Sequence, residues 1–287
     1  MKRPLLVLGA TGRLGRAVTA ELDRRGIAHD APSHVALDLF DHYSIWQWRF
    51  SMKISGVINV AGFTDVDAAE RPEHRVRAQR LNAETPHAIA EYCAAVEIPL
   101  VHISTDYVFD GEQDAPYREE DAVNPLQFYG VSKLDGERGV TAANPKALIV
   151  RVSTLYGLPE RPAYVDKILA AARAKGEGAL EVVELPVSSP TYAVDLAPVL
   201  LDLMDKGVSG IVHAVNDGGV SRLDLARAVV EVAGLGEKVE LRTRPPRDGD
   251  LRRPAYSVLG TDKLHSLLGH RLPPWKDALV RYLGSLR

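Results

Sequence analysis

The sequence predicts an α/β fold in which a doubly wound parallel sheet carries a smaller α/β lobe formed by the C-terminal part of the chain. Three observations predict this fold. Short, almost wholly apolar runs alternate with longer amphipathic runs in the first half of the chain, as parallel strands and the helices that cover them do. A glycine-rich segment directly follows the first apolar run, and the alternation becomes looser after about residue 155.

The predicted strands and helices of the first half follow one another in a regular order. The apolar runs are rich in Leu, Ile and Val and are bounded by Gly, Pro or Asn, as buried strands are. Strands are expected at 4–8, 56–60, 98–104 and 147–153, with a short second strand near 28–34. Helices are expected at 13–25, 74–95 and 125–142. Asn124 and Pro125 are expected to cap and begin the third helix.

The segment "GATGRLG" places Gly9, Gly12 and Gly15 between the first strand and the first helix. Glycine at these points allows a tight turn, a close approach of the backbone to a phosphate, and close packing of helix on strand. The N–H groups that open the helix then face the anion. This spacing therefore predicts a Rossmann-type domain that binds a dinucleotide.

The end of the second strand should distinguish the two nicotinamide dinucleotides. Asp30 would bind the 2′-hydroxyl of the adenosine ribose and favour NAD, whereas Ser33 and His34 would accept a 2′-phosphate and favour NADP. We expect NADPH, with NADH left open. Asp38 and Leu39 are expected to contact the adenine, with a solvated turn as the alternative.

The second half contains further helices and strands in a less regular order. They are "DKILAAARAKGEG" (helix ending at glycine), "ALEVVEL" (strand), "TYAVDLAPVLLDLM" (helix), "GIVHAV" (buried strand) and a last helix near 274–286. We expect residues 1–155, with a returning segment at about 192–220, to form the NAD(P)-binding domain. Residues of about 156–191 and 221–287 would form the substrate lobe. The site would lie between the two, beyond the carboxyl ends of the strands.

Small and hydroxyl-bearing residues follow the third and fourth strands. Ala61, Gly62 and then Thr64 leave room for a cofactor beside one strand end, and Ser104 and Thr105 end the next. Hydroxyl groups at the carboxyl end of a parallel strand point into the crevice where ligands bind.

Tyr129 and Lys133 share one helical face in "FYGVSK", because residues four apart are neighbours on a helix. A free tyrosine has a pKa of about 10. A lysine charge ~5 Å away, at an effective dielectric constant of ~20, contributes roughly 3 kcal/mol, or about two pKa units. The pair is therefore predicted to be a proton donor and the charge that lowers its pKa, with an ordinary helix pair as the alternative.

Motifs along most of the chain carry a family resemblance. They are "GATGRLG", "INVAGFTDVDAAE", "LNAETP", "HISTDYVFDG", "PYREEDAVNPLQFYGVSK", "GER", "SSPTYAVDLA" and "RRPAYSVLGTDKL". With these motifs the chain resembles the extended short-chain dehydrogenase/reductase superfamily and, within it, the dTDP-4-dehydrorhamnose reductase family. The resemblance is most specific over residues 102–138.

The resemblance implies reduction, by NADPH, of the C4 ketone of a dTDP-linked 4-keto-6-deoxyhexose. The implied catalytic residues are Thr105, Tyr129 and Lys133. The expected cofactor contacts are Gly9, Thr11, Gly12, Arg13, Leu14, Gly15, Asp38, Leu39, Ala61, Gly62, Thr64, Tyr129 and Lys133, and a structural role is implied for Asn82. The expected substrate contacts are Val66, Thr105, Asp106, Tyr107 and Thr154.

Two departures from the family pattern fall on the substrate side. Thr154 stands where the family commonly has tryptophan, and Pro186 and Ser188 replace its glutamine and glycine. The chain also resembles the regulatory β-subunit of methionine adenosyltransferase, through "YREED", "LYG" and "KLDGE". Two alternatives therefore stay open: a non-catalytic NADP-binding regulatory subunit, and a reductase of another nucleotide-linked keto-sugar.

The composition excludes several other classes of protein. The net charge of -3 indicates no nucleic-acid or polybasic membrane surface, and Cys93 alone cannot form a disulfide within the chain. The nine histidines are scattered without metal-ligand spacing, so no metal site is predicted. The apolar run at the start is too short for a signal peptide or a membrane span, and we expect a cytoplasmic protein. A homodimer, and a Mg²⁺ ion at a subunit contact, are left open.

Overall fold

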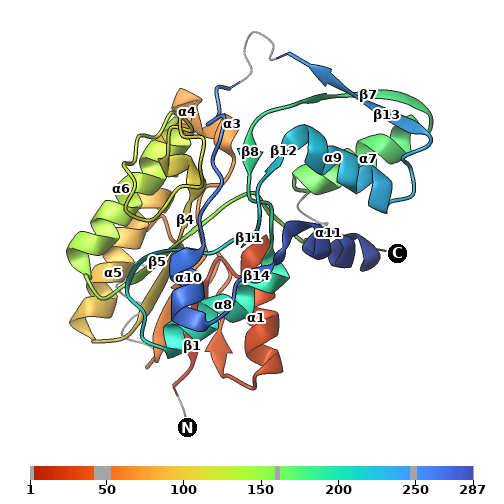
Figure 1. Cartoon of the computed structure of the whole chain (residues 1–287). Coiled ribbons are helices and arrows are strands. Elements are labelled where there is room, and N and C mark those ends of the chain that lie inside the picture. Colours follow the sequence, from red (N-terminus) through yellow and green to blue (C-terminus); the bar gives the residue numbers. More distant parts are fainter. Residues whose placement is uncertain (1–2, 42–52, 159–161, 246–250, 287) are drawn as a thin grey trace.

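A central sheet of six parallel strands organises the chain (Figure 1). The computed structural model describes residues 3–41, 53–158, 162–245 and 251–286. The strands run in the order β10-β5-β4-β3-β1-β2, and each pairs in parallel with its neighbours. Their bounds are β1 Leu5–Leu8, β2 His29–Asp30, β3 Gly56–Asn59, β4 Leu100–Thr105, β5 Leu148–Val152 and β10 Gly210–His213. The structure thus contains the predicted strands of the first half and places "GIVHAV" at the edge of the same sheet.

Helices cover both faces of this sheet, because successive side chains of a strand point in opposite directions. Val7 of β1 packs with α1 (Arg13–Arg24) and α8 (Ala193–Asp205) on one face. Leu6 and Leu8 pack with α5 (Thr85–Ala95) and α6 (Phe128–Ala143) on the other. The doubly wound arrangement predicted from the apolar runs is confirmed.

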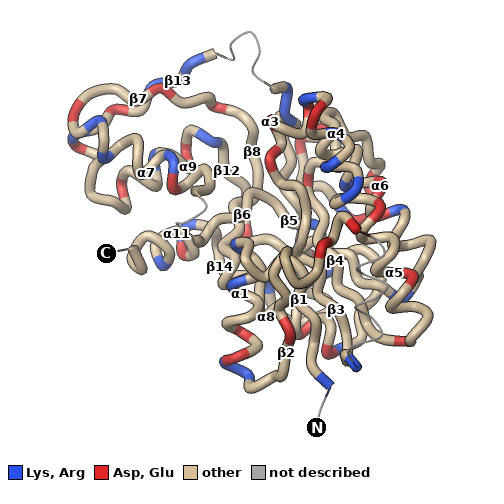
Figure 2. Tube along the Cα trace, turned by 180° about the vertical axis from the view of Figure 1, so that it is seen from behind, with Lys and Arg blue, Asp and Glu red and all other residues tan. Residues whose placement is uncertain are grey.

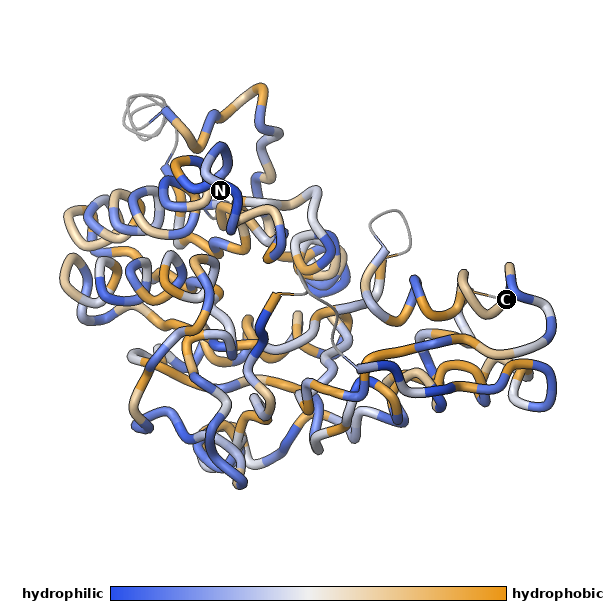
Figure 3. The backbone as a smooth tube through the Cα atoms, turned by 90° about the horizontal axis from the view of Figure 1, so that it is seen from above, coloured by the Kyte–Doolittle hydropathy of each residue, from blue (hydrophilic) through white to orange (hydrophobic). Residues whose placement is uncertain are grey.

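A second hydrophobic core forms a lobe that projects to one side of the sheet (Figure 3). The lobe contains the parallel pair β7 (Gly178–Val183) and β13 (Val239–Arg244), packed with α7 (Tyr164–Lys175), α9 (Arg222–Val232) and α11 (Trp275–Gly284). In contrast, Leu264 of α10 (Asp262–Leu268) and Leu272 belong to the core of the sheet domain. The chain therefore crosses between the two cores several times.

Short strands and turns make these crossings. Their ladders are β6 (Leu155–Tyr156) with β9 (Thr191–Tyr192), β8 (Val187–Ser188) with β12 (Val220–Ser221), and β11 (Asn216–Asp217) with β14 (Leu272–Pro274). The rings of Tyr156, Tyr192 and Tyr282 pack together, with centroids 5.4–5.6 Å apart. These contacts fix the lobe against the end of the sheet.

Two predicted helices differ from those observed. The helix expected over 74–95 consists of α4 (Pro72–Gln79), a π-helical turn η1 (Arg80–Glu84) and α5, while α3 (Val66–Ala69) precedes them. Helix α6 begins at Phe128 rather than at Pro125. The reason is that the Asn124 amide donates to the Asp110 carboxylate, which holds this residue in the preceding loop, and Glu70 instead accepts the Phe128 N–H at 2.6 Å.

Charged side chains lie mainly on the helices and outer loops, and few lie on the strands of the sheet (Figure 2). The interior of the sheet domain is mostly apolar, with buried polar residues at the strand ends and on the helices that face them, such as Asn82 and Glu137. Among the helices of the described ranges, none has the length and apolar character needed to cross a bilayer.

Candidate active site

The phosphate loop lies at the carboxyl end of β1, where the backbone is tightly packed. Gly9 has a φ of +83°, and a Cβ atom added to it would lie 2.6 Å from the Ala61 backbone nitrogen. A Cβ on Gly15 would lie 2.2 Å from the Gly9 carbonyl oxygen. These positions require glycine, because any side chain would force the loop away from β3 and α1.

Helix α1 opens toward this loop with its first N–H groups available to an anion. Its N-cap residue is Gly12, which has no side chain to cap these groups, and its first turn carries Arg13 rather than an acid. The Leu14 side chain is buried in the core, so only its backbone remains for a ligand, whereas Thr11 is exposed. A helix N-terminus of this kind fits the pyrophosphate of a dinucleotide.

The segment after β3 is held close to α6 by Asn82 on the π-helical turn. The Asn82 amide donates to the Phe63 carbonyl and to Ser132 Oγ, at 3.1 and 3.0 Å, and its oxygen accepts the Phe63 N–H at 2.8 Å. A Cβ on Gly62 would lie 3.1 Å from Asn82 Oδ1 and 4.0 Å from Lys133 Nζ. Asn82 therefore has the structural role expected for it, and Gly62 lies directly beside the lysine.

Thr105 and Tyr129 are brought together by β4 and α6. Thr105 Oγ1 accepts the Tyr107 N–H at 3.2 Å, and Thr105 is close enough to Tyr129 to lower the pKa of its phenol. The rings of Tyr107 and Tyr129 meet edge to face, with centroids 5.9 Å apart. The Tyr129 residue is partly exposed.

Lys133 follows Tyr129 by one turn of α6 and is almost wholly buried. Its Nζ donates to the Ile103 carbonyl at 2.5 Å. Burial lowers the pKa of Lys133 to about 8, and the carboxylate of Glu137 partly offsets this by raising it. The ammonium group is therefore mostly protonated at neutral pH.

The structure corrects the prediction that Lys133 lowers the pKa of Tyr129. Burial of the phenol is the largest effect and raises the pKa of Tyr129, the hydrogen bond with Thr105 lowers it, and the charges of Asp106 and Tyr107 raise it. The lysine charge is directed at the Ile103 carbonyl instead. A phenol with a raised pKa stays protonated at neutral pH, which is the form that a proton donor requires.

Asp106 was predicted as a substrate contact but lies behind the site. The residue is 2% exposed. Its Oδ2 accepts hydrogen bonds from Ser257 and Ser153 at 2.6 and 2.7 Å, and its Oδ1 accepts one from Thr105 at 3.1 Å. Because both oxygens are occupied by buried hydroxyl groups, this carboxylate faces the protein rather than the crevice.

The residues expected around the adenosine lie at the end of β2 and in the loop that follows it. Asp30 ends β2, and Ser33 and His34 are exposed in the following loop. The Asp38 carboxylate accepts the Phe40 N–H at 2.9 Å, and the Leu39 carbonyl accepts the Thr85 hydroxyl at 2.6 Å. The side chain of Asp38 therefore supports its own turn.

The two departures from the family pattern touch each other. The Thr154 and Ser188 hydroxyl oxygens lie 3.0 Å apart, and Thr154 has a φ of +41°, which is unfavourable for a β-branched residue. The Leu185-Pro186 peptide bond is cis. Thr154 and Ser188 thus form one polar pair in the segments that connect the sheet to the lobe. Val66 opens α3 after β3, at the same carboxyl edge of the parallel sheet.

Two arginines that the sequence analysis did not single out also lie at this crevice. Arg253 donates to both carboxylate oxygens of Asp67 at 2.8 Å and to the Tyr107 hydroxyl at 3.2 Å. Arg222 stacks on the Tyr164 ring, and its charge interacts with Tyr107 and Arg253. The motif "RRPAY" marked one of them as a matched position, but only the fold shows that it reaches Tyr107.

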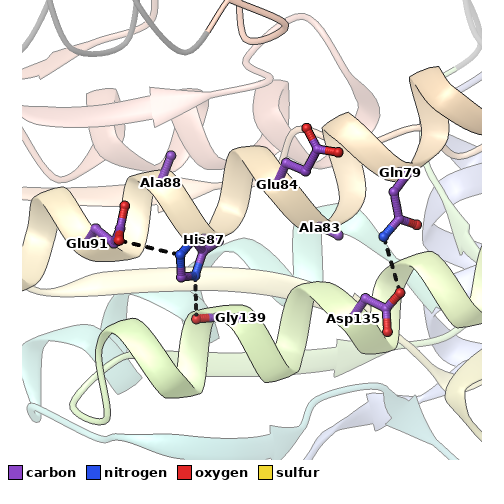
Figure 4. Close-up of a pocket in the computed structure, with 8 residues that line it drawn as sticks. All are labelled: Gln79, Ala83, Glu84, His87, Ala88, Glu91, Asp135 and Gly139. Carbon is purple, nitrogen blue, oxygen red and sulfur yellow. Dashed lines mark hydrogen bonds and ion pairs between the residues drawn. The ribbon is translucent and has the colours of Figure 1, made fainter.

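A separate hollow of about 440 Å³ lies on the outer face of α5 and α6 (Figure 4). His87 Nδ1 lies 3.0 Å from the Gly139 carbonyl oxygen, and Gln79 donates to Asp135 at 3.2 Å. None of the predicted site residues lines this hollow; the residues that do are Gln79, Ala83, Glu84, His87, Ala88, Glu91, Asp135 and Gly139. This hollow therefore does not mark the reaction site, which we place at the strand ends.

Comparison with known proteins identifies the family of the chain. The family model described as the RmlD substrate binding domain matches residues 1–287. A dTDP-4-dehydrorhamnose reductase of Mycolicibacterium smegmatis is 38% identical over 288 residues, which cover 97% of this chain and 84% of the relative. The chain belongs to the dTDP-4-dehydrorhamnose reductase family.

Two further proteins, one known from its sequence and one from its crystal structure, are similar to this chain over nearly its full length. A probable dTDP-4,6-dihydroxy-2-methyloxan-3-one 4-ketoreductase of Streptomyces antibioticus is 36% identical, covering 96% of this chain and 92% of the relative. The crystal structure of a Bacillus anthracis dTDP-4-dehydrorhamnose reductase in complex with NADP has a TM-score of 0.92 and 28% identity, covering 99% and 100% of the two chains. Membership of the reductase family is thus supported by sequence and by fold.

Proposed function

We propose that the chain reduces the C4 ketone of a dTDP-linked 4-keto-6-deoxyhexose with NADPH, as in the conversion of dTDP-4-dehydrorhamnose to dTDP-rhamnose. Family membership supports the reaction, and the Bacillus anthracis relative in complex with NADP supports the cofactor. The observation that carries the proposal is the geometry at the end of β4. The Tyr129 ring packs against Tyr107, whose N–H binds Thr105, and Lys133 binds the Ile103 carbonyl of the same strand.

The proposed chemistry divides between the cofactor and the side chains of the chain. When bound, NADPH supplies the hydride that the ketone carbon accepts. Tyr129 donates its hydroxyl proton to the oxygen on which negative charge develops, and Thr105 donates a hydrogen bond to the same oxygen. Lys133 holds the nicotinamide ribose with the part of its ammonium group that does not bind the Ile103 carbonyl.

The cofactor contacts predicted from the sequence are retained as proposals. The phosphate loop and the N-terminus of α1 would hold the pyrophosphate, and Ala61, Gly62 and Thr64 would border the nicotinamide half. Asp38 and Leu39 would border the adenine through the turn that they form. The fit of these residues rests on the close packing at Gly9 and Gly15, which holds the turn against β3 and α1 as a dinucleotide-binding loop requires.

On the substrate side, Arg253 and Arg222 are proposed to hold the diphosphate of the nucleotide sugar. A guanidinium group binds phosphate oxygens in a two-point geometry, and both arginines lie beside Tyr107. Asp67 binds Arg253 in the structure, so the diphosphate would share or replace this partner. Val66, Tyr107 and Thr154 are proposed to border the sugar.

The predicted division of the chain and its assembly are likewise proposals. Residues 1–155 with about 192–220 would form the cofactor domain, and about 156–191 with 221–287 the substrate lobe; the second hydrophobic core supports this lobe, although Leu264 and Leu272 pack with the first. A homodimer stays a prediction that light scattering would test. Within the described ranges, no group of three or more His, Cys, Asp or Glu side chains is arranged to hold a metal ion.

The test is the consumption of NADPH by the purified chain with dTDP-4-dehydrorhamnose, with the product identified by mass spectrometry and NMR. We expect turnover and formation of dTDP-rhamnose. Failure to reduce this or any related keto-sugar, combined with tight binding to a methionine adenosyltransferase, would instead support the regulatory-subunit alternative.

A reductase of another dTDP-linked keto-sugar is the second candidate, favoured by the polar Thr154–Ser188 pair and by the Streptomyces antibioticus relative. Competition between two dTDP-linked keto-sugars for the same enzyme separates the candidates. If the second is correct, the ratio of the two kcat/KM values should change in Thr154→Trp and Ser188→Gly. An unchanged ratio would show that this pair does not select the substrate.

A further inference from the structure

Asp106 joins three segments of the chain immediately behind Thr105. Thr105 ends β4, Ser153 follows β5, and Ser257 lies in the C-terminal segment that also carries Arg253. Each of the three hydroxyl groups donates to the Asp106 carboxylate. All four residues are buried, so the hydroxyl groups donate to the carboxylate rather than to bulk water.

The three hydrogen bonds are not equal. The two serines donate to Oδ2 over 2.6 and 2.7 Å, while Thr105 donates to Oδ1 over 3.1 Å. The serine bonds are in the range of strong bonds to an ionised oxygen, and the Thr105 bond is longer than that range. The threonine proton is therefore the one that Asp106 holds least firmly.

A threonine hydroxyl has one proton, and Thr105 donates its proton to Asp106 Oδ1. The oxygen of a ketone bound beside Tyr129 would be a second acceptor for it. The proton cannot be donated to both at once. Since Thr105 Oγ1 already accepts the Tyr107 N–H, the direction of its proton decides whether Thr105 is an acceptor or a donor toward the reacting oxygen.

We propose that Asp106 is a positioning residue that sets the direction of the Thr105 hydroxyl proton. While Asp106 is ionised, it draws this proton to Oδ1 and weakens the hydrogen bond that Thr105 donates to the ketone oxygen. Once Asp106 takes up a proton from solvent, Thr105 is free to donate to the oxygen of the ketone. The expected change in rate rests on the proposed reaction. The expected influence of Thr105 on the protonation of Asp106 rests on the structure alone.

The surroundings of Asp106 shift its pKa to a pH at which the folded protein can be studied. Burial raises the pKa of Asp106 to about 6, although the hydrogen bonds from Ser257, Ser153 and Thr105 lower it. Its titratable neighbours are Tyr129 on α6 and Tyr107, which in turn binds Arg253 from the C-terminal segment. The groups facing it from β5 and from the C-terminal segment are the two serine hydroxyls.

The first test does not depend on turnover. The infrared carbonyl stretch of the protonated Asp106 side chain, isolated as the difference between wild type and Asp106→Asn, should follow pH with a midpoint near 6. Thr105→Val should move this midpoint to higher pH, because it removes a hydrogen bond that favours the ionised form. Ser257→Ala should move it in the same direction and serves as a positive control. A midpoint unaffected by Thr105→Val would overturn the inference.

The second test uses the reaction. In the wild type, kcat should rise about fivefold as the pH falls through the Asp106 midpoint, the effect of one released neutral hydrogen bond. In Asp106→Asn, whose amide can donate to Thr105, kcat should lose this dependence and keep the higher value. In a Thr105→Val background, Asp106→Asn should have no such effect. An equal effect in both backgrounds would show that Asp106 is merely structural, whereas a wild type without any turnover would count against the proposed function instead.

Discussion

Glu137 of α6 and Arg151 of β5 form a buried two-point ion pair next to β4, the strand that ends at Thr105. Arg151 Nε donates to Glu137 Oε1 at 2.9 Å and Nη2 donates to Oε2 at 2.8 Å, and each side chain is 3% exposed. Ser104, next to Thr105, donates to the same carboxylate at 2.5 Å. Glu137 also lies one helical turn beyond Lys133 and raises the pKa of that lysine. One carboxylate thus links β4, β5 and the charge at the site.

Replacing Glu137 by Gln should make Lys133 lose its proton at lower pH. The pKa of Lys133 is already lowered to about 8 by burial, and the mutation removes the charge that opposes this effect. NADPH affinity, measured by fluorescence titration, should therefore weaken in the wild type as the pH rises through about 8 and in Glu137→Gln at lower pH. Asp135→Asn, on the same helix but 38% exposed, is the control and should leave the profile unchanged. Identical profiles for wild type and Glu137→Gln would contradict the role assigned to this carboxylate.

Arg253→Ala should weaken binding of the nucleotide sugar without much effect on the chemical step. A charge-assisted hydrogen bond contributes about 1.5–3 kcal/mol, so KM should rise roughly 10- to 100-fold while kcat changes little. Arg242→Ala is a matched control, because Arg242 pairs with Glu240 on an exposed strand of the lobe. Steady-state kinetics decide the question, and an unchanged KM would remove Arg253 from the substrate site.

Gly15→Ala should impair cofactor binding through the backbone. The added Cβ would lie 2.2 Å from the Gly9 carbonyl oxygen, so α1 or the loop must move. Overpacking of this kind costs about 1–3 kcal/mol, and we expect a lower Tm together with at least a ~10-fold weaker NADPH affinity. Gly284→Ala places its Cβ in open space and should change neither quantity. Normal NADPH affinity in Gly15→Ala would mean that this packing does not form the phosphate site.

Asp106 should also affect the pH dependence of stability. Its pKa is raised from 3.8 to about 6 in the folded protein, so the folded state binds the proton more readily than the unfolded state does. The contribution is therefore fully present below about pH 4 and is lost as the pH rises through about 6, a difference of about 3 kcal/mol. Urea unfolding at several pH values should show this change in the wild type relative to Asp106→Asn. A pH-independent difference between the two proteins would contradict the raised pKa.

Much of this architecture could be predicted from local patterns in the sequence. The wholly apolar runs identified the buried strands because each strand is covered on both faces, and the spacing of Gly9, Gly12 and Gly15 identified the turn after β1. The i,i+4 spacing placed Tyr129 and Lys133 on one face of α6. These features depend on neighbours in the chain, and local patterns record such neighbours well.

Contacts between distant segments could not be predicted in the same way. The sign of the shift in the pKa of Tyr129 depends on burial and on Thr105, and the environment of Asp106 is completed by Ser153 and Ser257. Arg253 reaches Tyr107 across 146 residues of sequence. The start of α6 was misplaced because Asp110, fourteen residues earlier, binds Asn124. In each case the deciding partner comes from another segment of the fold.

The central claim is that Tyr129 donates the proton to the reduced ketone. The most direct measurement compares kcat for reduction of the dTDP-linked keto-sugar between the wild type and Tyr129→Phe, together with the NADPH affinity of each. We predict that kcat falls at least ~100-fold, the scale of general acid catalysis, while NADPH affinity stays within about twofold because the ring and Lys133 remain. A Tyr129→Phe enzyme that reduces the sugar at close to the wild-type rate would contradict the claim.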